Sequence, residues 1–573
     1  MGKIDWDLSS LFENEEELDK SVDDVLTKAK KFEKLYKGKL NKLDAIEFNE
    51  AISEYESILE LLGQITTYAF LKFAQNSQYG SFYAKYQTLS IKCSEHLLFF
   101  ELEFNKLQPH TQNSFINSSE KYSYYLTNLT EEKKHQLSQK EERLLIKKDQ
   151  TGVSAFSRLF DEHFSKMKFL YDGKQISEET ILSLLSDSNR DVRKKASESF
   201  TKELKKHQHL LAYIFNMIRA DLKIDCELRG YKSAEEPRHK DNKISQKSVD
   251  ALIKAAQNSF GIVHRYYEKK REILGFDRLY DYDRYAPINS KDDEFSFEDS
   301  KKNVLDAFET FSPKFANIAK KAFEEGWIDV YPKENKQGGA FSHPATTNTH
   351  PYILLNHTDK RRDFFTLAHE LGHAIHQYLA KDVGYLASDT PLTTAETASV
   401  FAEMLVFDKL KETLNKQEKK ALLASKIEDI FATLYRQINF TTFERAVHSH
   451  DGELSLDEFN SFWIQESKKM FGKSVELTKN YQIWWSYIPH FIHSPFYCYA
   501  YSYGQLLVLA LYGLYKSEKM VDFVEKYEKF LSAGGSKSPK ELVGYFGFDI
   551  EDEKFWQIGL DEVKKLVDEF EEL

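Results

Sequence analysis

The sequence predicts a mainly α-helical protein, and three observations support this fold class. Helix-breaking residues are sparse, with 11 Pro and 23 Gly among 573 residues. Charged residues make up 30% of the chain, which is typical of helices that expose one face to solvent. In many segments apolar residues recur at steps of three and four, which places them on one side of a helix. The 14% aromatic content indicates extensive burial rather than disorder.

The first part of the chain carries several predicted helices. In residues 18–36 apolar side chains follow steps of four and three, and Gly38 supplies a stop signal. Similar patterns extend over residues 45–76 and 81–107, whereas residues 118–152 are rich in Lys and Glu and indicate a solvated helix. Because loops interrupt these segments, an antiparallel helical bundle is favoured over a coiled coil.

A β-hairpin is predicted at residues 168–177. Asp172-Gly173 lies between two short alternating runs, and both positions of such a turn require positive φ. We expect a domain boundary just after it, between an N-terminal helical domain (residues 1–180) and a second helical domain (residues 181–573). The helical pattern resumes after Ser188, which is a candidate cap.

Charge and cysteine content exclude several classes of partner and site. The net charge of −12 argues against nucleic acid and anionic membrane surfaces, since both require a basic footprint. The three cysteines are far apart and include no C-x-x-C pair, so neither a disulfide framework nor a thiolate metal site is indicated. The N-terminal sequence is acidic and carries no apolar signal stretch, so we expect a cytoplasmic protein.

One segment superficially resembles a membrane span. No Lys, Arg, Asp or Glu occurs between Asn480 and Tyr515. Its most apolar part covers only about ten residues, however, and a spanning helix needs roughly 20. We therefore predict a buried segment of a soluble protein.

The stretch TLAHELGHAIHQ, residues 366–377, contains an H-E-x-x-H motif within an otherwise apolar helix. His369 and His373 are four residues apart, so both imidazoles can bind one metal ion from the same helix face. Glu370 projects beside that ion, where its carboxylate can serve as a general base for an attacking water. A chance match is expected only about 0.05 times in a chain of this composition. Burial of these polar side chains without partners would also be unfavourable.

A catalytic zinc site requires a third protein ligand and one position for water. His376 lies on the same face but a further turn along, so we expect it outside the ligand set. Leu379 stands where a metzincin would have its third histidine, which excludes that arrangement. Glu396 and Glu403, on the following helix, are the remaining candidates. Thr393-x-x-Glu396 also fits a capping box, so position alone leaves both a ligand role and a structural role open for Glu396.

Stretches on both sides of the motif carry a family resemblance. The match to TLAHELGHAIH extends upstream through GGAFSHPATTNTHPYILLNHT and downstream to ETASVFAEM. The later IPHFIHSPFYCYAY and the N-terminal DLSSLF also match, so nearly the whole chain is covered. These segments resemble the oligoendopeptidase F branch of the thimet oligopeptidase-like zinc metallopeptidases, which are gluzincins.

This resemblance implies a ligand set and a fold. Glu396 would be the third ligand beside His369 and His373, with one Zn²⁺ per chain. The fold would be of the zincin type, with a small β-sheet beside the active-site helix and a deep substrate channel between two helical halves. Residues 181–573 would form the catalytic domain.

The resemblance also implies a His followed by a Tyr-rich patch that stabilises the developing oxyanion. PHFIHSPFYCYAY offers His490, His493, Tyr497, Tyr499 and Tyr501, although tyrosines in such a stripe also commonly form core. Tyr499 is the expected donor, Tyr497 its neighbour, and His490 the best match for the His. A Gly-rich loop found in some relatives is missing, so His490 and His493 both stay candidates. Neutral donors suit this role because they require no buried cation.

The segment HPYILLNHT is predicted as a strand that directly precedes the metal-binding helix. In related enzymes such a strand lies at the cleft edge and pairs with the substrate backbone. Gly338-Gly339 ahead of it fits either a mobile loop or an ordinary turn.

Together these features predict a zinc-dependent endopeptidase that hydrolyses internal bonds of short oligopeptides, with Glu370 as general base. The restriction to short peptides is implied by the channel of the family. The alternative is a non-catalytic helical binding or scaffold protein with a structural metal or core histidines. The absence of cysteines near the motif weakens the structural-metal version of that alternative.

Overall fold

A computed structural model of the chain describes residues 4–288 and 294–573. These residues form two compact units, and each unit is assembled from three separate segments of the chain. Unit 1 comprises Met1–Lys133, Asp292–Glu412 and Glu518–Gly547, and unit 2 comprises Lys134–Lys291, Thr413–Ser517 and Phe548–Leu573. The boundary expected after residue 180 therefore falls inside unit 2.

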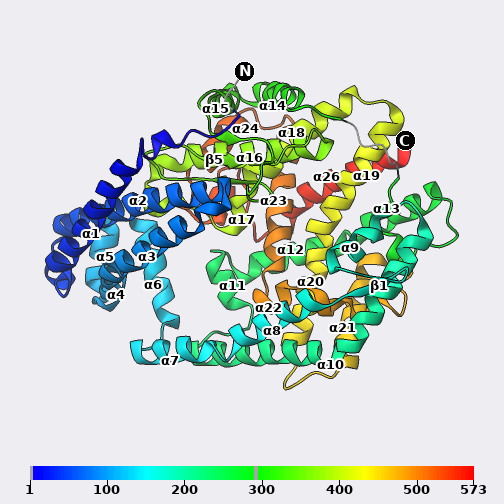
Figure 1. Cartoon of the computed structure of the whole chain (residues 1–573), viewed down its shortest axis with the longest axis horizontal. Helices are drawn as coiled ribbons and strands as arrows, with labels where there is room; N and C mark the ends of the chain where they lie inside the picture. Colours follow the sequence, from blue (N-terminus) through cyan, green and yellow to red (C-terminus); the bar gives the residue numbers. More distant parts are fainter. Residues whose placement is uncertain (1–3, 289–293) are drawn as a thin grey trace. The chain divides into compact units, whose positions relative to one another are not determined.

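Both units are mainly helical, which confirms the predicted fold class (Figure 1). The helices and strands of unit 1 are α1 (Glu15–Tyr36), α2 (Ala45–Gln75), α3 (Gly80–Leu97), α4 (Phe99–Lys106), α5 (Pro109–Ser118), α6 (Ser123–Glu132), α14 (Phe297–Phe311), α15 (Pro313–Glu324), β3 (Ile328–Asp329), β4 (Phe341–His343), β5 (Tyr352–Leu354), α16 (Arg361–Ala380), α17 (Leu392–Ala395), α18 (Thr397–Thr413), α24 (Phe523–Ser532) and α25 (Pro539–Gly544).

The regular elements of unit 2 are α7 (Gln139–Asp149), α8 (Val153–Lys166), β1 (Phe169–Tyr171), β2 (Lys174–Ile176), α9 (Glu178–Ser183), α10 (Arg190–Arg229), α11 (Glu236–Asp241), α12 (Gln246–Asn258), α13 (Phe260–Ile273), α19 (Lys416–Thr433), α20 (Tyr435–His448), α21 (Leu456–Phe471), α22 (His490–His493), α23 (Cys498–Lys516) and α26 (Glu553–Glu572).

The N-terminal helices of unit 1 follow the predicted pattern with two differences. Helices α1 and α2 match the predicted segments closely, and they pack side by side with α3 (Figure 1). The segment predicted at residues 81–107 is divided between α3 and α4, which meet at Leu98. The segment at residues 118–152 is likewise divided between α6 and α7. Buried aromatic rings fill the core between α1, α2, α4 and α5, and the Phe48 and Phe115 rings stack at a centroid distance of 4.0 Å.

The hairpin prediction is confirmed. Strands β1 and β2 pair antiparallel, and Asp172 and Gly173 adopt φ values of 45° and 77° at the turn. The cap assignment for the next helix is wrong by one residue. Asn189, rather than Ser188, caps α10, because its side chain accepts a hydrogen bond from the Asp191 N–H.

A three-stranded sheet in unit 1 lies beside α16, as predicted. Its strand order is β3-β5-β4, with β5 parallel to β3 and antiparallel to β4. The segment expected at the cleft edge is β5, and the structure places β5 in the middle of the sheet. Strand β4 is the edge strand on that side, and the Gln377 side chain of α16 hydrogen bonds both the hydroxyl and the carbonyl of Ser342 in β4.

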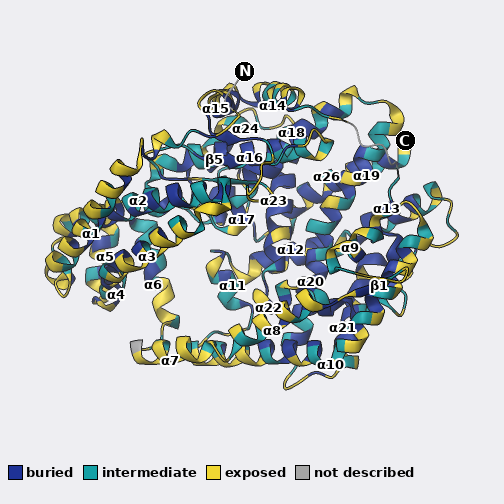
Figure 2. Ribbon diagram, in the orientation of Figure 1, coloured by how far each residue is buried: buried dark blue, intermediate teal, exposed yellow. Residues whose placement is uncertain are grey.

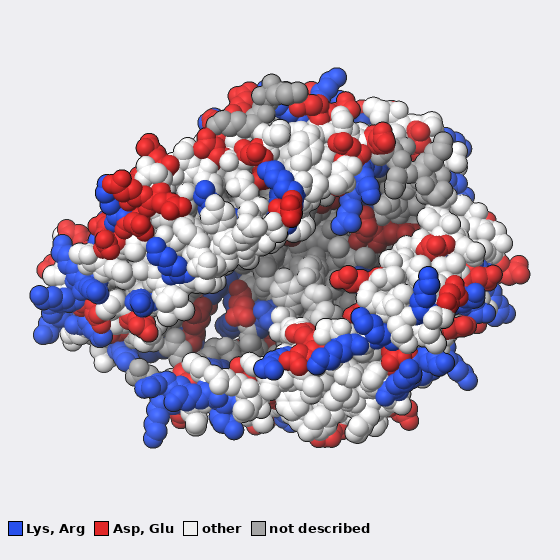
Figure 3. Space-filling view, in the orientation of Figure 1, with Lys and Arg blue, Asp and Glu red and all other residues white. Residues whose placement is uncertain are grey.

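The charge-free segment after Asn480 is largely buried within unit 2, which confirms its predicted burial. Helix α23 is almost entirely buried because α26, α20, α19 and α12 pack around it (Figure 2). Gly559 of α26 permits this close packing, since a Cβ atom there would lie 2.7 Å from the Leu506 carbonyl oxygen. Among the described residues, no helix combines the length and apolarity needed to cross a bilayer. On the face drawn in Figure 3, acidic and basic side chains intermix over much of the surface.

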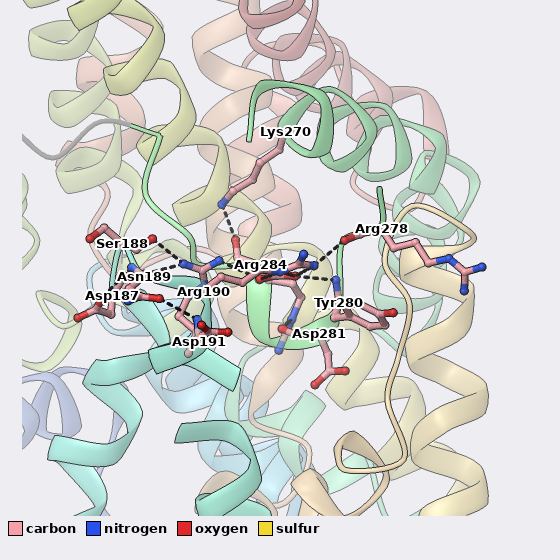
Figure 4. A network of polar contacts seen from close by, with 12 residues as sticks. Asp187, Ser188, Asn189, Arg190, Asp191, Lys270, Arg278, Tyr280, Asp281 and Arg284 are labelled. Atoms are coloured by element: carbon pink, nitrogen blue, oxygen red, sulfur yellow. Dashed lines mark hydrogen bonds and ion pairs between the residues drawn. The ribbon is translucent and has the colours of Figure 1, made fainter. Parts of the chain in front are cut away.

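A buried ionic network stabilises one end of α10 (Figure 4). The Asp283 carboxylate is fully buried and accepts hydrogen bonds from the Arg193 guanidinium at 2.8 Å and from the Arg190 guanidinium at 2.7 Å. Asp283 also accepts the Tyr280 N–H, and buried Lys270 donates to the Arg284 carbonyl at 2.6 Å. The single Asp283 carboxylate thus balances the charges of both Arg190 and Arg193.

We expect Asp283→Ala to destabilise the protein by about 3–5 kcal/mol, because it leaves the buried Arg193 guanidinium without a counter-charge. Urea unfolding followed by circular dichroism measures this change. Arg158→Ala removes an exposed ion pair with Glu162 in the same unit and should leave the unfolding midpoint unchanged. Equal midpoints for the two variants would contradict this account of the network.

Candidate metal centre

The two histidines of the H-E-x-x-H motif converge as predicted. His369 and His373 lie one turn apart on α16, and their Nε2 atoms are separated by 3.2 Å. Both side chains are partly buried, with 26% and 19% of their surface exposed. The opposite face of the helix is apolar and packs into unit 1, which fixes the direction in which both imidazoles point.

Glu396 lies at the junction of α17 and α18 and turns its carboxylate toward the two histidines. Its Oε2 atom is 3.4 Å from Nε2 of His369 and 3.4 Å from Nε2 of His373. The capping-box alternative does not hold, since Pro391 precedes α17 as its N-cap and Thr393 lies inside that helix. The Ser399 hydroxyl, one turn into α18, donates to the same Glu396 oxygen at 2.7 Å and so orients the carboxylate.

These three side chains form a compact set of metal-ligand type, and the ligand atoms all lie within 4.8 Å of one another. Burial would raise the pKa of Glu396, but the hydrogen bond and charge of His373, together with His369, lower that pKa to about 2. The carboxylate is therefore ionised at neutral pH and can serve as an anionic ligand.

Glu403 contacts His369 and lies outside the group formed by His369, His373 and Glu396. Its Oε1 atom accepts a hydrogen bond from Nδ1 of His369 at 2.6 Å, which leaves Nε2 as the atom that faces His373 and Glu396. Burial would lower the pKa of His369, but the hydrogen bond to Glu403 and the surrounding carboxylates raise it to about 9. A metal ion would have to displace a proton from this imidazole below that pH.

Gly372 allows α16 and α18 to approach each other closely. A Cβ atom at this position would lie 2.5 Å from the Ala398 carbonyl oxygen and 2.6 Å from Cα of Ser399. These are backbone atoms of α18, so any side chain at residue 372 would push α18, and Glu396 with it, away from α16.

Glu370 lies beside the ligand set and lines a pocket of about 540 Å³. Its side chain is buried, and no hydrogen bond or ion pair joins its carboxylate to another residue in the described part of the chain. Burial raises the pKa of Glu370, an effect that the charges of His369 and His373 oppose. His376, one turn beyond His373, is buried outside the set, and burial lowers its pKa to about 3.

In unit 2 the two candidate histidines have different surroundings. The His490 ring lies parallel to the Tyr497 ring at a centroid distance of 6.0 Å, and its Nε2 atom is 3.2 Å from the Tyr501 hydroxyl. His493 instead pairs with Asp161 of α8 at 2.8 Å. Only His490 therefore belongs to the tyrosine cluster. Burial and the nearby Arg436 charge lower the pKa of His490, which favours its neutral form.

Tyr499 lies deeper than its neighbours. Its side chain is fully buried, and its hydroxyl is 2.9 Å from Nδ1 of His239 and 2.9 Å from Nδ2 of Asn242. Burial raises the pKa of Tyr499 well above the usual range. Tyr501, which the sequence offered but did not favour, is 38% exposed and is the tyrosine that contacts His490.

Comparison with known proteins decides the family. The sequence model described as peptidase family M3 matches residues 183–562, and one described as oligopeptidase F matches residues 103–169. The chain belongs to peptidase family M3. This M3 chain is thus a metalloendopeptidase, and the family resemblance seen in the sequence is confirmed.

Individual relatives agree over the full length of the chain. The M3 chain is 30% identical to an oligoendopeptidase F homolog of Borreliella burgdorferi, with 98% of each chain covered. It is 28% identical to an oligoendopeptidase F homolog of Lactococcus lactis subsp. lactis over 100% of this chain and 97% of the relative. A crystal structure assigned to a peptidase of Chlamydophila abortus shares the fold, with a TM-score of 0.92 at 21% identity over 99% of this chain and 98% of the other.

Three residues beside this group make contacts that the sequence analysis did not predict. Glu403 had been weighed only as an alternative ligand, although it lies seven residues, about two helical turns, after Glu396. Ser399 and Gly372 were not singled out. The small residues around Glu396 and the glycine inside the motif were the available signals.

We expect Gly372→Ala to weaken metal binding at least tenfold, because the added methyl group displaces the α18 backbone. Competition with a fluorescent chelator measures the metal affinity. Gly261→Ala is the matched control, since Gly261 also lies in a helix and nothing lies within 4 Å of its Cβ position. The idea fails if both variants bind metal as tightly as the wild type.

The two acidic residues of α18 should differ in effect. Glu396→Ala should abolish stoichiometric metal binding, whereas Glu403→Ala should weaken it about 10- to 100-fold, as expected for a residue that only orients a ligand. Metal content after dialysis at graded free metal concentrations separates the two outcomes. Identical affinities would show that Glu396 is not a ligand.

Proposed function

We propose that this M3 peptidase is a zinc-dependent endopeptidase that hydrolyses internal bonds of short peptides. The separation of the three ligand atoms carries the proposal. A tetrahedral zinc ion with bonds of about 2.0–2.1 Å places neighbouring ligand atoms about 3.3–3.4 Å apart. The three separations between His369, His373 and Glu396 are 3.2, 3.4 and 3.4 Å. These separations match three corners of a zinc tetrahedron, which supports the proposal.

Glu370 is proposed as the general base. A bound zinc ion supplies Lewis acidity toward the peptide carbonyl and makes water a better nucleophile at neutral pH. The Glu370 carboxylate takes a proton from the attacking water and then delivers it to the nitrogen of the leaving amine. Its burial, its raised pKa and the absence of a bonding partner among the described residues support this role.

Neutral donors are proposed for the negative charge that develops on the carbonyl oxygen. His490, Tyr497 and Tyr499 were the expected donors, and their segment carries no charged side chain. The lowered pKa of His490 and its contact with Tyr501 support a donor role for His490 in its neutral form. Tyr499 would act only after its hydroxyl exchanges its contacts with His239 and Asn242.

The edge strand β4 is proposed to align the substrate backbone. The sequence analysis expected β5 to have this role. Only an edge strand can pair with an added chain, and β4 is at the edge of the sheet whereas β5 is central. The residues that lead into β4, Gly339 and Ala340, line the same pocket as Glu370. Several relatives are described as oligoendopeptidases or oligopeptidases, which supports short peptides as substrates. Membership in a peptidase family argues against the non-catalytic alternative.

Incubation of the protein with a mixed peptide library, followed by mass spectrometry, tests the proposed activity. We expect cleavage at internal bonds of short peptides, its loss after chelation, and its recovery when Zn²⁺ is restored. Glu370→Gln should keep about one metal ion per chain while lowering the turnover rate about 10²- to 10⁴-fold.

Glu324→Gln, at an exposed position of α15 in the same unit, is the control and should cleave like the wild type. Wild-type rates in the Glu370→Gln variant would disprove the assignment of the base. Cleavage that survives complete metal removal would disprove the zinc mechanism.

A further inference from the structure

The pocket beside the metal centre extends well beyond the residues used so far. From His369, Glu370 and Glu403 it continues along the first two turns of α16. Its other walls are the Gly339-Ala340 entry into β4 and the chain that follows β5. A volume of about 540 Å³ lies within the range of specific small-ligand sites. The pocket is thus large enough to receive part of a peptide.

Two cations line this pocket without a counter-ion. Arg362 and Lys360 are exposed lining residues, and across the two described ranges no carboxylate forms an ion pair with either side chain. Arg362 lies seven residues before His369, so it occupies nearly the same face of α16, about 10 Å along the helix axis.

The acidic residues of the same pocket are largely occupied. One Asp363 oxygen accepts hydrogen bonds from the Thr358 N–H at 2.7 Å, the Thr358 hydroxyl at 2.9 Å and the Lys360 N–H at 3.2 Å. Glu403 is engaged with His369. These carboxylates serve the protein itself, whereas the two cations remain available to a ligand.

A second wall of the pocket is fixed in place by hydrogen bonds. The Asn356 side-chain amide donates to the Gln337 carbonyl at 3.0 Å and to the Gly339 carbonyl at 2.8 Å, which fastens the glycine loop to the chain after β5. Both amide protons are thereby used, so the Arg362 guanidinium is the main donor left for an incoming anion.

We propose that this pocket binds a carboxylate of the peptide substrate, with Arg362 as the specificity-determining residue and Lys360 adding charge. A planar guanidinium matches a carboxylate with two parallel hydrogen bonds. An extended peptide advances about 3.3 Å per residue, so this carboxylate would lie about three residues from the bond that is cut. It is either the C-terminal carboxylate of a short peptide or an Asp or Glu side chain. The inference rests on the proposed peptidase function.

Paired peptides test the inference and distinguish the two sources. One pair differs only in a free or amidated C-terminus and carries no acidic residue. A second set has amidated ends and places Glu or Gln in turn at three positions on each side of the cleaved bond. We expect wild-type kcat/KM to favour the carboxylate at least tenfold in one of these comparisons, mainly through KM.

Arg362→Ala should bring that preference close to one and leave the neutral peptides within twofold of the wild type. Arg362→Glu should reverse the preference, and Arg362→Lys should retain part of it. Lys20→Ala, on the exposed surface of α1, is the control and should behave like the wild type. The inference is overturned if the carboxylate preference is absent or unchanged in the Arg362 variants, or if all peptides lose rate equally.

A binding measurement separates this inference from the peptidase proposal. Calorimetric titration of the same peptide pairs into metal-loaded Glu370→Gln protein reports carboxylate recognition without turnover. If the Arg362→Ala substitution is added to this protein and the difference in affinity disappears, the result supports the carboxylate site. This holds even if the wild type cleaves no peptide. Equal affinity for both members of every pair overturns it.

Discussion

The close crossing of α16 and α18 at Gly372 is the constraint on which the site depends. His369 and His373 come from one helix and Glu396 directly precedes the other, so the separation of the three side chains is set by how closely the two backbones approach. The absent side chain at Gly372 brings the Ala398 carbonyl against α16. Glu396 then reaches both imidazoles, while Glu403, two turns further along α18, holds the outer nitrogen of His369. Glu396 and Glu403 therefore contact the two nitrogen atoms of the same imidazole.

Much of the site could be predicted from the sequence, because its geometry is local. Residues four apart on a helix share a face whatever the rest of the chain does, which is why His369, Glu370 and His373 could be placed. Glu396 was different. Its spacing allowed a cap as readily as a ligand, and only the family resemblance favoured the ligand. The role of Glu403 depends on how two helices cross, and no pattern within either helix encodes that crossing.

The limits of the fold prediction have the same origin. Helices such as α1 and α2 follow from periodicity, and the hairpin follows from the turn chemistry of Asp172-Gly173. Strand order does not follow from such local patterns, because β5 becomes the central strand only by pairing with residues 25 positions earlier in the chain. The assembly of each unit from three segments is a non-local property as well. The sequence analysis predicted one boundary near residue 180, whereas each unit combines three segments that are far apart in the sequence.

Two titratable side chains of unit 2, Glu444 and His448, lie beside Phe496. Phe496 adopts a φ of 58°, and the buried Glu444 carboxyl accepts its N–H at 2.7 Å. Burial raises the pKa of Glu444 well above its usual range and lowers the pKa of the neighbouring His448 to about 3. Both groups thus favour their neutral forms. The Glu444 carboxyl, which favours its neutral form, thus hydrogen bonds to Phe496 in its positive-φ conformation directly before Tyr497.

The interleaving of the two units has a consequence for biosynthesis. Unit 1 needs its third segment, which ends at Gly547, and unit 2 needs α26, which covers α23. Neither hydrophobic core can therefore be completed before its third segment has been translated. A nascent chain exposes the apolar surface of α23 from the time this helix is translated until α26 has followed it.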